Sequence, residues 1–216
     1  MDIFHMDSPL MQKLGLLFDL MILNVLTVLL SLPVITTGAA ATALYDAAWR
    51  LKHNRGNLIR DYWRSFCSNF KQATGLWLFL LVFGLILGYN VLLLIGGQAG
   101  MALMIIPMLL GAIVWIIISA WLFPLQSRFE DTVGRTIINA LLCGLRFLPR
   151  TVAMSVLNLG PWVLLVLTPE TFFRWGLIWA FLWFGVAAYS NICLLDGPLS
   201  VLAGSDPDET GEAALE

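Results

Sequence analysis

Apolar segments of the length that crosses a bilayer constrain this chain more than any other feature. A helix needs about 20 apolar residues, at about 1.5 Å of rise each, to span the hydrocarbon core. Five segments approach or meet this length, at about residues 14–37, 73–95, 101–123, 151–167 and 175–195. The second and third contain no charged residue. Because lipid offers no partner to an unpaired backbone N–H or C=O, each segment is expected to be helical.

The composition agrees with these segments. Hydrophobic residues make up 59% of the chain and charged residues 12%, whereas soluble domains carry roughly 25% charged residues. The sequence therefore predicts an all-α integral membrane protein with one transmembrane helical domain over residues 1–203. The acidic end, residues 204–216, has no apolar periodicity and is predicted to be a disordered tail.

The distribution of basic residues predicts the orientation in the membrane. Ten of the 12 Lys and Arg residues fall in the segments 38–72 and 124–150, between the predicted spans. Short loops rich in Lys and Arg stay on the cytoplasmic side. We therefore expect a multi-pass protein of the bacterial cytoplasmic membrane, with the N-terminus outside, five spans, and the C-terminus inside.

Both basic segments contain an amphipathic pattern directly before a predicted span. In "NLIRDYWRSFCSNFKQA" and in "RTIINALLCGLRFLPR", apolar residues recur at three- and four-residue steps, and basic residues take the opposite face. Such helices lie in the interface, with the basic face toward anionic headgroups. We interpret each as an interfacial elbow helix that contacts the lipid bilayer. The order of elbow, span and span occurs twice, which indicates either an internal repeat or a chance similarity between apolar helices.

The segment "TTGAAATALYDAAWRL" follows the first span and predicts a further helix from Ala39 to about His53. Its small residues allow helix backbones to approach closely, so packing is one explanation. The alternative concerns Asp46 and Arg50, which lie one helical turn apart and could form a buried pair at a docking or ligand surface. With basic residues from both basic segments, the candidate docking or ligand surface comprises Asp46, Arg50, Lys71, Arg128 and Arg150.

Asparagines inside the predicted spans raise a second hypothesis. Asn24, Asn90 and Asn158 lie at depths where amides usually form hydrogen bonds between helices. They could instead line a polar cavity near the midplane. The protein would then be a small transporter or channel rather than an interaction partner.

Other classes of function lack the residues that they need. His5 and His53 stand alone, and the three cysteines form no CxxC pair, so neither a metal site nor a cofactor is expected. No nucleophile is paired with a base and no glycine-rich phosphate loop is present, so we expect no enzyme. The basic residues are spread along helices predicted to lie on the membrane, and we expect no nucleic-acid partner.

Four stretches together resemble a known family. They are "LPVITTGAAATALYDAAWRL", "SFCSNFKQATGLWL", "LFPLQSRFED" and "NALLCGLRFLPRTV", and they resemble the YesL family of bacterial membrane proteins, a domain of unknown function. The resemblance covers about Leu20 to Leu195. It implies an auxiliary role in carbohydrate utilisation, with sugar ABC transporter subunits as candidate partners. It implies no catalytic residues.

Overall fold

The computed structural model describes residues 9–96, 101–129, 131–174, 176 and 179–203, and these residues form helices and connecting loops with no strand. Four of the helical segments are long and apolar enough to cross a membrane: Met11–Ser31, Leu58–Ile95, Ile105–Gln126 and Leu148–Leu167. The prediction of an all-helical, multi-pass membrane protein is therefore confirmed at this level. The predicted acidic tail, residues 204–216, lies outside the described residues.

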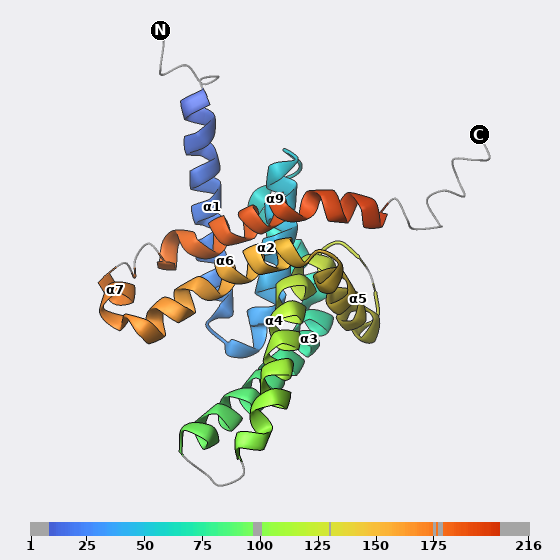
Figure 1. The fold of residues 1–216 in the computed structure, drawn as a ribbon. Helices are drawn as coiled ribbons and strands as arrows, with labels where there is room; N and C mark the ends of the chain where they lie inside the picture. The colour runs from blue at the N-terminus through green and yellow to red at the C-terminus, as the bar shows by residue number, and fades with distance from the viewer. Residues whose placement is uncertain (1–8, 97–100, 130, 175, 177–178, 204–216) are drawn as a thin grey trace, which may run out of the picture.

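Figure 1 shows the order of the helices along the chain. They are α1 (Pro9–Ser31), α2 (Thr37–Lys52), α3 (Leu58–Ile95), α4 (Ile105–Gln126), α5 (Val133–Arg146), α6 (Leu148–Leu167), α7 (Pro169–Arg174) and α9 (Phe184–Ala203). Short 3-10 helices at Val34–Thr36 and Met101–Met104 precede α2 and α4, and a π-helical turn at Trp179–Trp183 precedes α9.

Two predicted boundaries were wrong. The first apolar helix ends at Ser31 rather than near residue 37, because Pro33 lacks an N–H and disfavours helical geometry at the residue before it. The elbow predicted at residues 57–72 is not a separate helix. It continues without a break into the second span as the 38-residue helix α3, since no proline interrupts it and Gly75, the glycine nearest the junction, costs only about 1 kcal/mol.

A fifth span is not confirmed. Of the predicted segment 175–195, residues 175, 177 and 178 lie outside the described residues. Its remainder forms the π-helical turn and the start of α9. Helix α9 also contains Asp196 and Pro198, and it is not among the four segments that meet the length and hydropathy of a span.

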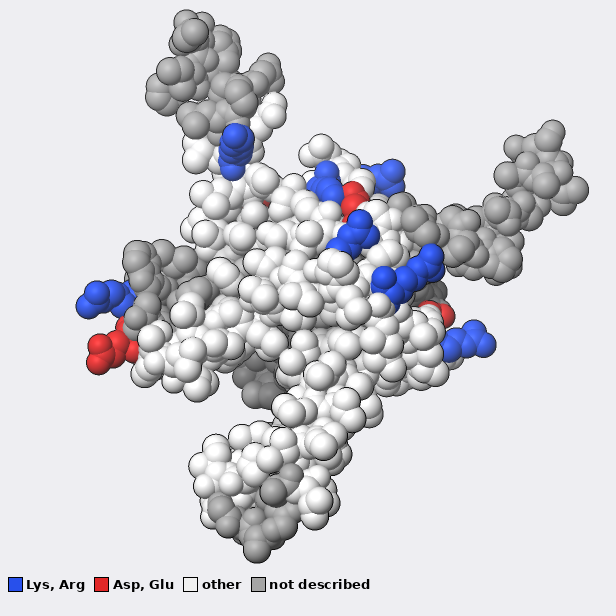
Figure 2. All heavy atoms as spheres, viewed as in Figure 1, with Lys and Arg blue, Asp and Glu red and all other residues white. Residues whose placement is uncertain are grey.

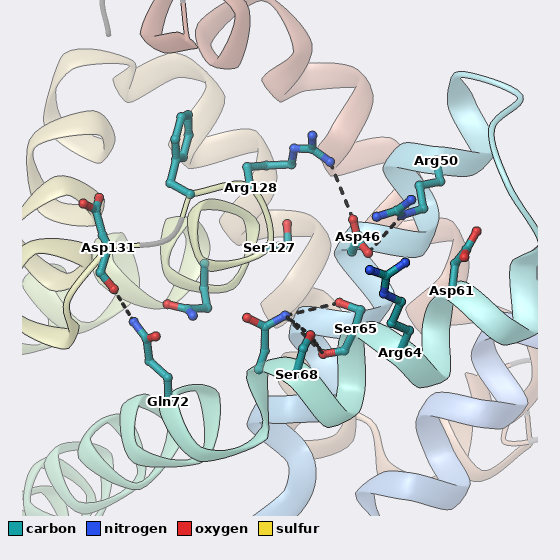
Figure 3. Close-up of a pocket in the computed structure, with 13 residues that line it drawn as sticks. Asp46, Arg50, Asp61, Arg64, Ser65, Ser68, Gln72, Ser127, Arg128 and Asp131 are labelled. Carbon is teal, nitrogen blue, oxygen red and sulfur yellow. Dashed lines mark hydrogen bonds and ion pairs between the residues drawn. The ribbon is translucent and has the colours of Figure 1, made fainter. Parts of the chain in front are cut away.

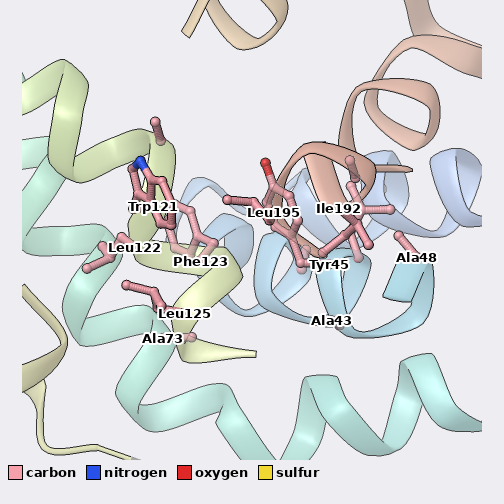
Figure 4. Close-up of a cluster of buried hydrophobic side chains, with 14 of the residues drawn as sticks. Ala43, Tyr45, Ala48, Ala73, Trp121, Leu122, Phe123, Leu125, Ile192 and Leu195 are labelled. Atoms are coloured by element: carbon pink, nitrogen blue, oxygen red, sulfur yellow. The ribbon is translucent and has the colours of Figure 1, made fainter. Parts of the chain in front are cut away.

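Helix α2 lies at the centre of the packing, in contact with α1, α3, α4 and α9. Its small residues are almost completely buried: Ala39, Ala40, Ala43, Ala47 and Ala48. Larger side chains from the neighbouring helices, including Ile192 and Leu195 of α9, belong to the same buried cluster (Figure 4). Small side chains on α2 therefore let several helix backbones approach one central helix.

The closest approach involves Gly38 in the first turn of α2. A Cβ atom placed there would overlap the carbonyl oxygen of Ala73 and lie 2.5 Å from Cβ of Trp77, both on α3. Any side chain at this position would push α2 and α3 apart. A glycine at position 38 therefore permits the close contact between α2 and α3.

Buried polar groups join the helices around α2. The Tyr62 hydroxyl of α3 donates a hydrogen bond to the Ala40 carbonyl of α2 and lies 3.1 Å from Oγ1 of Thr27 in α1. On the other side, Nδ2 of Asn191 in α9 donates to the Tyr45 hydroxyl at 2.9 Å. Because an unpaired polar group in an apolar interior is costly, these bonds fix the register of the four helices.

Helices α3 and α4 extend away from the rest of the molecule as a hairpin (Figure 1). Residues 72–127 contain no Asp, Glu, Lys or Arg, and the hairpin accordingly shows no charged atoms in Figure 2. Large apolar side chains such as Leu85, Ile106 and Leu110 are exposed along it. Exposed apolar surface of this extent indicates contact with lipid.

Helices α1 and α3 run in the same direction through the molecule, with α2 antiparallel between them (Figure 1). Thr27 lies beside Tyr62 near the start of α3, and farther along both segments Nε1 of Trp77 donates to the Val34 carbonyl at 2.7 Å. The five-span prediction requires the first two spans to cross in opposite directions. The sequence predicted the helix from Ala39 to about His53 but not its course, and α2 turns the chain back between α1 and α3.

Helix α5 matches the second predicted elbow as a separate amphipathic helix. Ala140 and Gly144 are buried, and a Cβ on Gly144 would overlap Ile117 of α4. The opposite face exposes Ile138, Leu142 and Leu145. An apolar face turned away from the helix core fits an interfacial helix.

We predict that Gly38→Ala destabilises the protein by about 1–3 kcal/mol, because the added methyl overlaps the α3 backbone. The matched control is Gly75→Ala, since a Cβ there has nothing within 4 Å and alanine favours a helix by about 1 kcal/mol. Thermal unfolding of the detergent-solubilised protein measures both. Equal melting temperatures for the two variants would contradict the close approach of α2 and α3.

Candidate functional site

A polar pocket of about 530 Å³ lies where α2, α3 and the end of α4 meet (Figure 3). We call it the arginine pocket, because Arg50, Arg64 and Arg128 enter it from three different segments. Its other lining residues are Asp46, Asp61, Ser65, Ser68, Asn69, Gln72, Gln126, Ser127, Phe129 and Asp131. The charge-free stretch of the hairpin begins and ends at this pocket.

Asp46 holds two of the three arginines. Its side chain is almost buried, at 8% exposure. One carboxylate oxygen accepts a hydrogen bond from Nε of Arg50 at 3.1 Å, and the other lies 3.6 Å from a guanidinium nitrogen of Arg128. Asp46 and Arg50 therefore form a pair, but the pair is only partly buried because the Arg50 side chain is 41% exposed. Arg128 extends it to a cluster that links α2 to the end of α4.

Arg128 is fixed by a second contact. Its guanidinium lies over the Trp49 ring, 3.6 Å from the ring centroid, a geometry that favours a cation–π interaction. Burial lowers the pKa of Arg128 from its ordinary value, while the Asp46 carboxylate acts in the opposite direction. An arginine remains charged at neutral pH, so Asp46 and Trp49 together hold a partly buried cation in place.

The two other carboxylates of the pocket have structural partners. Asp61 accepts a hydrogen bond from the backbone N–H of Asn57 at 2.8 Å, at the start of α3. Asp131 accepts from Nδ2 of Asn139 at 2.9 Å. The carbonyl of Asp131 also accepts from Nε2 of Gln72. The loop after α4 is thus tied to both α5 and α3.

Gln126 differs from these residues because its side-chain oxygen accepts no hydrogen bond within the described part of the chain. It is the last residue of α4 and 4% exposed. Among the described residues, its Oε1 atom has no hydrogen-bond partner. Buried polar atoms without a partner are uncommon, so Gln126 marks the part of the pocket where a ligand could contribute a hydrogen bond.

The structure brings together three of the five residues predicted for the docking or ligand surface. Asp46, Arg50 and Arg128 line the arginine pocket. Lys71 is exposed on α3 outside its lining. Arg150 lies at the start of α6, 5.5 Å from the centroid of the Phe147 ring.

The three asparagines predicted to line a cavity lie apart from one another. Oδ1 of Asn24 accepts from the Gly185 N–H at 3.0 Å, and Oδ1 of Asn158 accepts from Asn191 at 2.9 Å. Asn90 donates to the Ile86 carbonyl of its own helix. None of the three lines the arginine pocket. This arrangement matches the role of amides as hydrogen bonds within and between helices, and it gives the transport hypothesis no support.

Sequence reasoning did not select Arg64, Gln126 or Asp131 for the site. Arg64 belongs to an amphipathic stretch that reads as a surface for headgroups, and one glutamine at a helix end has no distinctive spacing. The available signal was the cluster "QSRFED" directly after a charge-free span. Several polar and charged residues in a row at the end of a span indicate that the chain leaves the apolar region there.

Comparison with known proteins adds limited information. Residues 20–91 match a family model described as a protein of unknown function, DUF624, and this match covers a third of the chain. It includes α2 and almost all of α3, and it ends before Arg128. No curated protein and no solved structure gives a significant match to the chain.

We predict that Asp46→Asn lowers the stability of the protein by about 1–3 kcal/mol, because Arg50 and Arg128 then lose their shared carboxylate. Glu170→Gln is the control, since it removes the same charge at an exposed position on α7. Chemical denaturation in detergent measures the difference. A loss no greater than that of the control would show that the cluster does not stabilise the fold.

Proposed function

We propose that this protein is a non-enzymatic membrane protein that docks a cytoplasmic or membrane partner at the arginine pocket. One observation carries the proposal: three arginines converge at the end of a charge-free hairpin, and two of them contact Asp46. Arg64, the third, is exposed and forms no ion pair among the described residues. An exposed arginine beside a cluster held by a carboxylate suits recognition of an acidic surface.

The resemblance to the YesL family, of which the chain would be a member, supports a choice of partner. It favours an accessory role in carbohydrate uptake in bacteria, with subunits of a sugar ABC transporter as the partner. The matched family model over residues 20–91 carries no function of its own. The identity of the partner therefore rests on the resemblance, and the location of the contact rests on the pocket.

We further propose that the arginine pocket faces the cytoplasm, since basic segments remain on that side. The distribution of Lys and Arg, combined with five spans, predicts that Met1 lies outside. The shared direction of α1 and α3 supports the opposite side for Met1, because both helices would then cross outward from the cytoplasm while α2 returns between them. Helix α2 is about 24 Å long, which is shorter than a full span.

A reporter fused before Met1 decides between these topologies. A fluorescent protein that fluoresces only when it folds in the cytoplasm should be functional if α1 and α3 cross in the same direction. A periplasmic alkaline phosphatase fusion should be functional if the charge count alone is right. In both topologies α6 crosses outward, so a fusion after Glu216 should report the cytoplasm only if residues 175–195 cross back, and a periplasmic signal there would contradict that fifth crossing.

The docking proposal predicts that tagged protein co-purifies with transporter subunits from cells grown on the relevant sugar. Arg64→Glu should reduce the recovered partner about tenfold, because a reversed charge meets the acidic surface. Arg135→Glu is the matched control, as Arg135 is exposed on α5 and outside the pocket lining. Recovery of lone wild-type protein, or equal loss in both variants, would contradict docking at this pocket.

A further inference from the structure

The arginine pocket also has the features of a small-molecule site, and this goes beyond docking because it requires no protein partner. Its volume of about 530 Å³ lies within the range of small-ligand pockets. Three serines, two glutamines and one asparagine accompany the charged residues in its lining. Such a lining can form many hydrogen bonds to one polar molecule.

The charges in the pocket are unevenly placed. Figure 3 shows Arg50, Arg64 and Arg128 on the side of Asp46 and Asp61, and Asp131 on the opposite side near Gln72. The first side therefore has one positive charge in excess. A ligand would place an anionic group at this arginine side, where Arg64 has no ion pair within the described part of the chain.

The rest of the pocket offers hydrogen-bonding groups and no positive charge. The carboxamide of Gln126 is buried and its Oε1 atom lacks a partner among the described residues. Ser127 lines the same pocket, and Gln72 lies near Asp131, whose carboxylate is a further acceptor (Figure 3). Hydroxyl groups satisfy such residues well, because a hydroxyl both donates and accepts.

From these two halves we infer that the arginine pocket binds a phosphorylated polyol, with its phosphate at Arg64 and Arg50 and its hydroxyl groups at Gln126 and Asp131. Arginine recognises phosphate through charge-assisted hydrogen bonds. Two sources supply this chemistry: a soluble sugar or glycerol phosphate, and the glycerophosphate headgroup of an anionic lipid beside the hairpin.

Calorimetry on the purified full-length protein in neutral detergent tests the inference with three probes. Glycerol 3-phosphate should bind at least tenfold more tightly than inorganic phosphate, which lacks the hydroxyl groups, and glycerol alone should not bind. Absence of glycerol 3-phosphate binding, or equal affinity for inorganic phosphate, would overturn the inference. Neither result depends on whether a protein partner docks.

Two variants locate the site. Arg64→Gln should weaken glycerol 3-phosphate about tenfold, the loss expected for one charge-assisted contact. Gln126→Leu should weaken glycerol 3-phosphate and leave inorganic phosphate unchanged, which a merely unfolded protein could not do. Arg146→Gln, exposed on α5 outside the pocket, should bind as the wild type. Full affinity in the Arg64 variant would overturn the assignment.

Lipid nanodiscs separate the two sources of the ligand. With phosphatidylcholine alone, soluble glycerol 3-phosphate should bind as it does in detergent. If added phosphatidylglycerol abolishes that binding, the headgroup is the ligand, and if binding is unchanged, the soluble phosphate is. Both outcomes support a phosphorylated polyol. Loss of glycerol 3-phosphate binding in phosphatidylcholine nanodiscs would contradict a pocket that is open to water.

Discussion

The close approach of helix backbones at α2 is the constraint on which the rest of the structure depends. Gly38 allows α3 to contact the start of α2, and a row of alanines allows α1 and α9 to approach from other sides. In a membrane, helices gain little from burying apolar surface against each other, so tight packing and hydrogen bonds must hold them together. The bonds of Tyr62 and Asn191 to α2 and its neighbours supply the polar part of this contact.

The arginine pocket follows from the same arrangement. Because α2 and α3 are antiparallel and in contact, the last turns of α2 carry Asp46 and Arg50 to the first third of α3. Helix α4 returns along α3 and ends there, which places Arg128 within reach of Asp46 and Trp49. One end of the molecule thus concentrates charge and hydrogen-bonding groups, while the hairpin beyond it contains neither Lys and Arg nor Asp and Glu.

The sequence was sufficient for the helical class, for most span positions, and for the pair of Asp46 and Arg50, because these depend on local periodicity and on charge. It was insufficient where distant segments decide. Packing between distant parts of the chain determines three features that were not predicted. They are the continuous helix from residues 57–72 into the next span, the direction of α1 relative to α3, and the contact of Arg128 with Asp46. Gln126 was overlooked because its significance lies in the lack of a partner, which no sequence pattern displays.

The most direct test of a polar pocket at the end of an apolar hairpin measures which residues are accessible to water, and from which side of the membrane. In a variant whose native cysteines are replaced by serine, Ser68→Cys places a thiol in the arginine pocket, and Leu85→Cys places one on the apolar hairpin. A membrane-impermeant maleimide should label Ser68→Cys rapidly in inside-out vesicles and slowly in right-side-out vesicles, and should label Leu85→Cys in neither. Rapid labelling of Leu85→Cys, or labelling of Ser68→Cys only from the outside, would contradict the proposal that the pocket opens to the cytoplasm at the end of a lipid-embedded hairpin.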